Sequence, residues 1–355
     1  MRALRLPALA LVGTVLPTCR TAAPTFAPDP ASVVYVTTGS TASLRGLSAV
    51  DERVVWVRGS DATCLRTIDG GVTWSRLTVP GAAGLDFRDV EALDAERAWL
   101  MSAGPGDASR IYATTDGGRT FELQFTNPHP AGFLDGIAFW DELAGLAYGD
   151  PVDGRFYVIR TENGGRTWER VAAEGMPPAL PGEAGFAASG TGLRVLGENH
   201  AWFCTGGGGT ARVFRTRDRG ATWSVAATPL AARESSAGGF SLAFRDETNG
   251  VLVGGDYTQP ERASDHYAVT RDGGVTWTVP ARSAPSGYRS CVAFAPGGPS
   301  SPLLALGRAG GDVSGDGGAS WRRFTDEGFY VFDFAGGMAW AAGADGRVAR
   351  IAGND

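Results

Sequence analysis

The nine residues RTIDGGVTW (66–74) recur, with small changes, along most of the chain. The five other copies are ATTDGGRTF (113–121), RTENGGRTW (160–168), RTRDRGATW (215–223), VTRDGGVTW (269–277) and SGDGGASW (314–321). Every copy has Asp or Asn, then Gly two residues later, Thr or Ser four later and an aromatic five later. The Asp and Asn positions are separated by 47, 47, 55, 54 and 44 residues, and are Asp69, Asp116, Asn163, Asp218, Asp272 and Asp316. This spacing indicates a fold built from repeated supersecondary units.

Each copy has the residues of a tight β-turn. A short Asp or Asn side chain accepts backbone N–H groups, glycine takes positive φ, and the aromatic packs into a sheet. The six segments, called the repeated turns below, resemble the Asp box of the BNR-repeat, sialidase-like propellers. That resemblance implies a β-propeller, and it implies a structural rather than catalytic role for these carboxylates.

Two further strands can be found in each repeat. Seven copies of an apolar second strand occur against six repeated turns, at 54–59, 98–104, 144–150, 201–207, 250–256, 303–310 and 339–346. An inner strand precedes each of them. The last repeat has only three strands before the chain ends, and SVVYVTT (32–38) can supply the fourth. We therefore predict an all-β fold, a single seven-bladed β-propeller over residues 32–355, in which the N-terminal strand closes blade 7.

The first residues have the pattern of an export signal. Arg2 and Arg5 precede an apolar stretch from Leu6 to Leu16 that is too short to span a bilayer. We expect a signal peptide over residues 1–19, with Cys19 as an alternative site of lipid attachment, and a flexible tether over 20–31. The protein would then be exported and periplasmic or envelope-associated, with a membrane contact only through a lipid at Cys19.

Composition excludes several classes of function. All 32 basic residues are arginine, which removes Schiff-base, P-loop and Ser-Lys chemistry. A formal net charge of −6 argues against a nucleic-acid partner. His129, His200 and His266 stand far apart, so we expect no metal site, and no cofactor motif is present. Besides Cys19, the chain has Cys64, Cys204 and Cys291, which we expect to be buried apolar side chains.

One face of the propeller is the candidate binding face. The repeated turns occupy the opposite face, whereas the long insertions 175–189 and 254–268 fall on the face where inner strands begin. Arg45, Arg88 and Arg289 stand at three of these starts and would focus a positive field on a carboxylate or phosphate. The alternative is that they pair with carboxylates such as Asp89, Asp135 and Asp333. The candidate binding residues are Arg45, Arg88, Asp135, Asp150, Asp153, Arg155, Glu183, Asp256, Tyr257 and Arg289.

Three classes of function follow from the resemblance. The chain is similar to the family of photosystem II assembly and stability factors and their relatives in non-photosynthetic bacteria, which implies a non-enzymatic protein that holds a polypeptide or anionic ligand on its channel face. The alternative is a sialidase-like glycoside hydrolase, for which Tyr288, Tyr330 and Glu183 are the nominees. An oxidoreductase is a third and weaker alternative. We expect no cofactor, and we expect the protein to be a monomer.

Overall fold

The computed structural model describes residues 26–298 and 300–353. The signal peptide predicted for residues 1–19 and the lipid site predicted at Cys19 lie outside the described residues. Within the described part of the chain, no helix has the length and hydropathy needed to cross a membrane.

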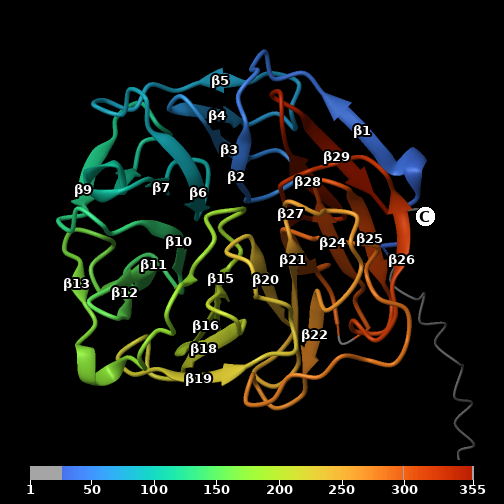
Figure 1. Ribbon diagram of the computed structural model, residues 1–355. Coiled ribbons are helices and arrows are strands. Elements are labelled where there is room, and N and C mark those ends of the chain that lie inside the picture. Colours follow the sequence, from blue (N-terminus) through green and yellow to red (C-terminus); the bar gives the residue numbers. More distant parts are fainter. Residues whose placement is uncertain (1–25, 299, 354–355) are drawn as a thin grey trace, which may run out of the picture.

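The protein is a seven-bladed β-propeller, as the repeats predict (Figure 1). Each blade is an antiparallel sheet, and the strands of a blade follow the chain outward from the central channel. Blade 1 consists of β2 (Leu44–Ala49), β3 (Val55–Gly59), β4 (Thr63–Thr67) and β5 (Ser75–Arg76). Blade 2 consists of β6 (Asp86–Ala92), β7 (Ala98–Ala103), β8 (Arg110–Thr114) and β9 (Glu122–Thr126). Blade 3 consists of β10 (Leu134–Phe139), β11 (Gly145–Val152), β12 (Arg155–Thr161) and β13 (Glu169–Arg170). Blade 4 consists of β15 (Leu193–Leu196), β16 (His200–Cys204), β18 (Arg212–Thr216) and β19 (Ser224–Ala227). Blade 6 consists of β23 (Cys291–Phe294), β24 (Leu303–Gly307), β25 (Gly310–Ser314) and β26 (Arg322–Thr325).

Blade 5 lacks a regular outer strand. It contains β20 (Ala237–Phe244), β21 (Gly250–Asp256) and β22 (Tyr267–Thr270), and two short strands, β14 (Glu183–Ala184) and β17 (Gly206–Gly207), extend its inner edge. Outside β22 the pairing is reduced to one bridge, in which Val269 and Thr278 exchange N–H···O bonds of 2.8 and 2.9 Å. Pro280 follows two residues later and has no N–H to continue the ladder.

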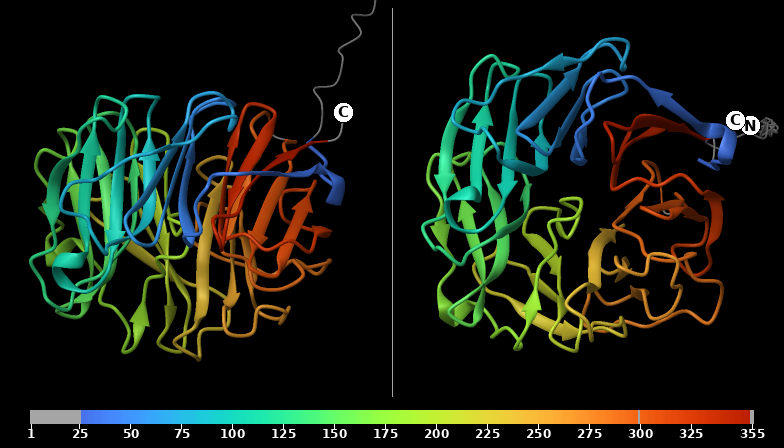
Figure 2. Two further views of the ribbon diagram at one scale, coloured as in Figure 1. Left: turned by 90° about the horizontal axis from the view of Figure 1, so that it is seen from above. Right: turned by 45° about the horizontal axis from the view of Figure 1, so that its top comes forward.

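Blade 7 joins the two ends of the chain, which confirms the predicted closure. It contains β27 (Val331–Ala335), β28 (Met338–Ala342), β29 (Val348–Ala352) and, on the outside, β1 (Val33–Val36). Strand β1 runs antiparallel to β29, with Val33 opposite Ile351 and Val36 opposite Val348. Figure 2 shows the blue N-terminal strand beside the red C-terminal strands. The ring is therefore closed by backbone hydrogen bonds between segments about 300 residues apart.

Residues 20–25 of the flexible tether expected over 20–31 lie outside the described residues, and the described part, 26–31, contacts the propeller. From Phe26 onward it packs on the propeller: the Phe26 ring meets Phe334 edge-on at 5.1 Å, and the Pro28 carbonyl accepts from Arg322 Nη2 at 3.2 Å. Asp29 then caps a short 3-10 helix, η1 (Pro30–Ser32), by accepting from the backbone N–H of Ala31 and Ser32. The Phe26 ring and the Asp29 cap give this Pro/Ala-rich segment contacts that its composition does not predict.

The repeated turns share one hydrogen-bond pattern. In the first, Asp69 Oδ1 accepts from Thr73 N at 2.9 Å, and Asp69 Oδ2 accepts from Thr73 Oγ1 at 2.6 Å. A residue that the motif analysis left out completes the pattern: Thr67 Oγ1 donates to Asp69 Oδ1 and accepts from Gly71 N. Thr or Ser stands at this position in every copy, as Thr67, Thr114, Thr161, Thr216, Thr270 and Ser314.

Tryptophans tie two of the repeated turns to a neighbouring blade. Trp202, on β16, is 1% exposed, and its indole N–H donates to the Gly273 carbonyl in the turn of blade 5 at 2.9 Å. Trp99, on β7, donates in the same way to Gly164 in the turn of blade 3 at 3.0 Å. Burial of such large rings between sheets supplies much of the apolar surface that holds the blades together. Cys64, Cys204 and Cys291 are free and buried, as expected.

Candidate functional site

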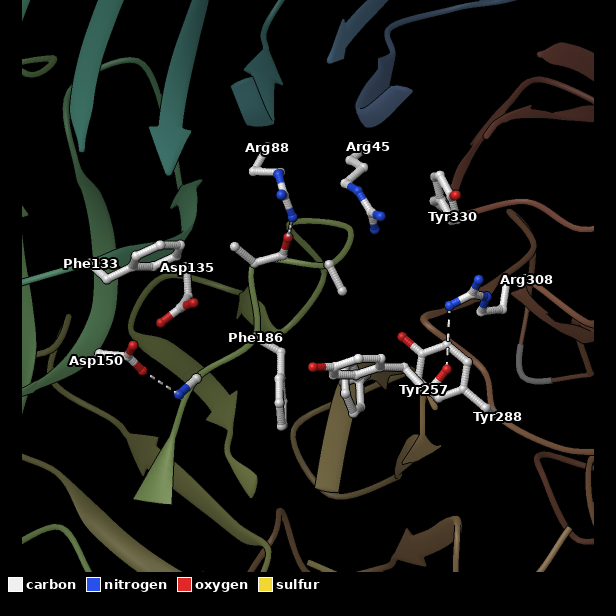
Figure 3. A pocket seen from close by; sticks show the side chains of 14 residues that line it. Arg45, Arg88, Phe133, Asp135, Asp150, Phe186, Tyr257, Tyr288, Arg308 and Tyr330 are labelled. Atoms are coloured by element: carbon white, nitrogen blue, oxygen red, sulfur yellow. Dashed lines mark hydrogen bonds between the residues drawn. The ribbon is translucent and has the colours of Figure 1, made fainter. Parts of the chain in front are cut away.

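A cavity of about 360 Å³ opens at the channel on the face opposite the repeated turns (Figure 3). The cavity wall includes residues at or near the starts of inner strands, namely Arg45, Arg88, Asp135, Phe240 and Tyr330. It also includes Asp150, near the end of β11, and Tyr257 and Arg308, in turns after second strands. The crossing from blade 3 to blade 4 supplies residues 185–188, which come from the predicted insertion. The site thus draws on several blades, which the closed ring holds in fixed positions.

Two guanidinium groups form the positive side of this cavity. Arg88 is held in place, since its Nε lies 2.6 Å from Asp86 Oδ2 and its Nη1 donates to the Ala187 carbonyl at 2.8 Å. Arg45 instead stacks over the Tyr330 ring, with its guanidinium carbon 4.1 Å from the ring centre. Among the described residues, no carboxylate forms an ion pair with Arg45. Burial and the neighbouring Arg88 lower the pKa of Arg45, because two cations share a poorly solvated place.

A third arginine, which the sequence reasoning missed, stands across the cavity. Arg308 lies in the turn between β24 and β25, is exposed, and donates from Nη1 to the Tyr257 carbonyl at 3.4 Å. The position of Arg308 in the sequence could have indicated this, because turns between second and third strands reach the same face as the starts of the inner strands. From such turns the sequence-based prediction named Arg155 but not Arg308.

Aromatic rings line the part of the cavity below the arginines. Phe186 stacks on Phe240 with ring centres 3.9 Å apart, and Tyr288 meets Phe240 edge-on at 4.9 Å. Tyr257 is 42% exposed and stands at the rim. Burial strongly raises the pKa of the Tyr288 phenol, which therefore stays neutral. Such a wall suits the apolar part of a ligand whose anionic group meets the arginines.

Two acids form the third side of the cavity. Asp135 is 2% exposed, and Asp150 accepts from the Gly185 N–H through Oδ1 at 2.9 Å. Burial, followed by repulsion from Asp150, raises the pKa of Asp135 well above its usual range. Burial also raises the pKa of Asp150.

Four predicted residues lie elsewhere. Asp153 stands in the exposed β11–β12 turn, 3.6 Å from Arg170 Nη1, and Arg155 Nη1 donates to the Met176 carbonyl. Glu183 is buried in an ion pair with Arg212 and accepts from Thr205 Oγ1 at 2.6 Å. Asp256 accepts from Thr258 N and Oγ1, which makes it the cap of a turn. The structure therefore brings Arg45, Arg88, Asp135, Asp150 and Tyr257 together at the cavity, and it leaves these four outside.

The structure corrects the position predicted for Arg289. We expect this residue at the channel mouth, but its side chain is completely buried, and its Nη2 lies 2.6 Å from Asp312 Oδ2. It also donates to Ser286 Oγ and to the Tyr288 carbonyl, each at 2.7 Å. The alternative of carboxylate pairing applies here, with Asp312 as the partner, a residue the sequence reasoning did not consider. His266 is likewise buried, with Nε2 2.9 Å from the Pro285 carbonyl.

Deeper in the channel, a second cavity of about 240 Å³ is lined by acids. Asp89 accepts from the backbone N–H of Val90 and Ile137, each at 2.8 Å, which joins blade 2 to blade 3. Burial, with Asp89 and Asp333 nearby, raises the pKa of Glu91 to about 8. Within residues 26–298 and 300–353, no group of three or more His, Cys, Asp or Glu side chains is placed to hold a metal ion.

Comparison with known proteins places the fold. No family model matches the sequence, and no curated protein does. The structure of YCF48 bound to D1 peptide is similar, with a TM-score of 0.64, 18% identity, and coverage of 94% of this chain and 100% of that one. YCF48 from Cyanidioschyzon merolae follows, with a TM-score of 0.62, 17% identity, and coverage of 90% and 98%. The WD40 β-propeller domain of Doa1 has a TM-score of 0.59 at 12% identity, over 90% and 96% of the two chains. At these identities the likeness is one of fold.

Proposed function

We propose that this protein is a non-enzymatic binding protein whose channel-face cavity holds a carboxylate group of a partner polypeptide. The observation that carries the proposal is Arg45, a guanidinium with no carboxylate partner among the described residues, placed beside Arg88 and on the Tyr330 ring. A planar, preorganised pair of guanidinium groups suits bidentate recognition of a carboxylate. The aromatic wall below it would accept a neighbouring apolar side chain.

The similarity to YCF48 supports a polypeptide as the ligand. That protein has been solved with a D1 peptide, and its fold extends over nearly the whole of this chain. We transfer the class of ligand, a peptide segment, and not the identity of the partner.

Glycoside hydrolysis of the sialidase type is less well supported. It needs a tyrosine nucleophile paired with a glutamate, and Glu183, the nominee, is paired with Arg212 and Thr205 instead. The raised pKa of Tyr288 works against its use as a nucleophile. Turnover of a fluorogenic sialoside, lost on replacing Tyr288 by Phe, would favour this alternative.

The site of action is a separate proposal. The pattern of residues 1–19 supports export, with Cys19 as the alternative lipid site. Mass spectrometry of the mature N-terminus from membrane and soluble envelope fractions tests it. An intact Met1 in the cytoplasm would contradict export.

Isothermal titration calorimetry with acetyl-Ala-Phe-norleucine tests the binding function. We expect the free acid to bind at least about tenfold more tightly than its C-terminal amide, and Arg45→Gln to abolish that difference. Arg119→Gln is the matched control, because Arg119 is 77% exposed in a repeated turn on the opposite face. Equal affinity for acid and amide in the wild type would overturn the proposal.

A further inference from the structure

The acidic side of the cavity has a feature that the binding of a carboxylate does not explain. Asp135, at the start of β10, is 2% exposed, and its Oδ2 has no hydrogen-bond partner in the described part of the molecule. Asp150, on β11, lies close enough to repel it electrostatically. Figure 3 shows both side chains on one side of the cavity, apart from Arg45 and Arg308.

Three other acids of this protein with little exposure to solvent are compensated. Glu183 pairs with Arg212, and Asp312 pairs with Arg289. Asp333 accepts a backbone N–H on each oxygen, from Ala49 at 3.0 Å and from Phe334 at 2.9 Å. A buried polar atom without a partner costs free energy, and most such atoms in native proteins are satisfied. The unsatisfied oxygen of Asp135 stands at a cavity, where a ligand can supply the missing donor.

The charges on the two sides of the cavity select the kind of donor. Arg45 and Arg308 repel a cation from their parts of the cavity, whereas Asp135 and Asp150 offer carboxyl oxygens on the far side from Arg308. Arg88 lies between the two regions and favours the charged form of Asp135. An ammonium group carries three donors and a positive charge, so it can satisfy both acids at once. Phe133 lines the cavity close by and suits the apolar stem of a long basic side chain.

We propose that Asp135 and Asp150 form a subsite for the side chain of a basic residue, in the same polypeptide segment whose carboxylate meets the arginines. The inference rests on the proposed function, since it assigns a second contact to the same ligand. It makes the cavity selective for a segment that carries opposite charges near each other, and against a segment that is only acidic.

Three peptides separate this inference from the proposed function. Acetyl-Ala-Phe-lysine and acetyl-Ala-Phe-norleucine, both as free acids, differ only in the ammonium group, and the lysine peptide amide lacks only the carboxylate. Titration calorimetry in 0.15 M salt should give the lysine acid about tenfold higher affinity than the norleucine acid. Asp135→Asn and Asp150→Asn should each bring this ratio close to one.

Asp153→Asn is the matched control. The net charge of −6 favours any cationic peptide, and Asp153→Asn makes the same chemical substitution on the same β11–β12 hairpin but outside the cavity. The lysine preference should persist in this variant.

The outcomes are distinguishable. Equal affinity for the lysine and norleucine acids in the wild type, or a lysine preference that survives in both cavity variants, would overturn the subsite. Equal affinity for the lysine acid and its amide would overturn the carboxylate site instead. If no peptide binds, both proposals fail.

Discussion

The guanidinium carbon of Arg45 lies 4.1 Å from the centre of the Tyr330 ring, so that blade 1 and blade 7 meet at the cavity. Tyr330 immediately precedes β27, whose sheet is completed by the N-terminal strand β1. Closure of the ring and placement of the unpaired cation are therefore parts of one arrangement.

Removal of the closing strand β1 should weaken the closure of the ring and, with it, the placement of Arg45. Deletion of residues 33–36 exposes the edge of β29, and we expect the melting temperature to fall by about 5 °C or more, with a broader transition. Val34→Thr is the control, because Val34 is 49% exposed and its substitution keeps the backbone pairing. An unchanged melting curve for the deletion, measured by circular dichroism, would contradict the role given to β1.

The buried pair of Arg289 and Asp312 should contribute to stability and not to binding. Asp312→Asn leaves an uncompensated buried cation and should lower the free energy of unfolding by about 3–5 kcal/mol in urea titrations. The double variant Arg289→Met with Asp312→Leu should recover most of that loss. If Arg289→Met instead abolished peptide binding at full stability, Arg289 would belong to the site after all.

Acid should destabilise the repeated turns. Hydrogen bonds from the Thr73 side chain and backbone lower the pKa of Asp69 to about 2, and bonds from Thr120 do the same for Asp116. Because these values lie below the ~3.9 of an unfolded chain, the carboxylates stabilise the fold above that pH, and the effect is lost as pH falls from about 4 to 2.

Asn163 suggests the variant that checks this. Its amide keeps the turn, with Oδ1 accepting from Thr167 N at 2.9 Å and Nδ2 donating to Thr167 Oγ1 at 2.8 Å. Asp116→Asn should therefore fold and should lose less stability than the wild type between pH 4 and pH 2. A steeper acid loss in the variant would contradict the assignment.

The channel acids should act in the opposite direction. The pKa of Glu91 is raised to about 8, above its value in an unfolded chain, so stability should decrease as pH rises from about 4 to 8. Glu91→Gln should make the melting temperature less sensitive between pH 5 and pH 8. Glu96→Gln, whose side chain is 56% exposed, should leave the wild-type pH dependence unchanged.

The sequence predicts the ring because its evidence is repeated. Six copies of one turn and seven of one strand fix the number of blades, and the unpaired last repeat requires β1. It does not predict the weak outer edge of blade 5, where the repeated turn is intact and Pro280 lies beyond it. The anchoring of Phe26 on Phe334 depends on two residues far apart in the chain, which no local pattern records.

The site is harder to predict, because the start of an inner strand fixes the position of a residue's backbone but not the position of the charged group at the end of its side chain. Arg45 and Arg289 occupy similar positions, but Asp312 on β25 draws Arg289 into the blade. Arg308 comes from a turn in which the sequence has no insertion, so nothing in the local pattern distinguishes it from the other arginines of the chain.

A crystal structure of the protein with acetyl-Ala-Phe-lysine tests the central claim most directly. We expect the peptide carboxylate within hydrogen-bond distance of Arg45 and Arg88, and the lysine ammonium between Asp135 and Asp150. A peptide bound on the face of the repeated turns, or one whose carboxylate contacts neither arginine, would contradict it.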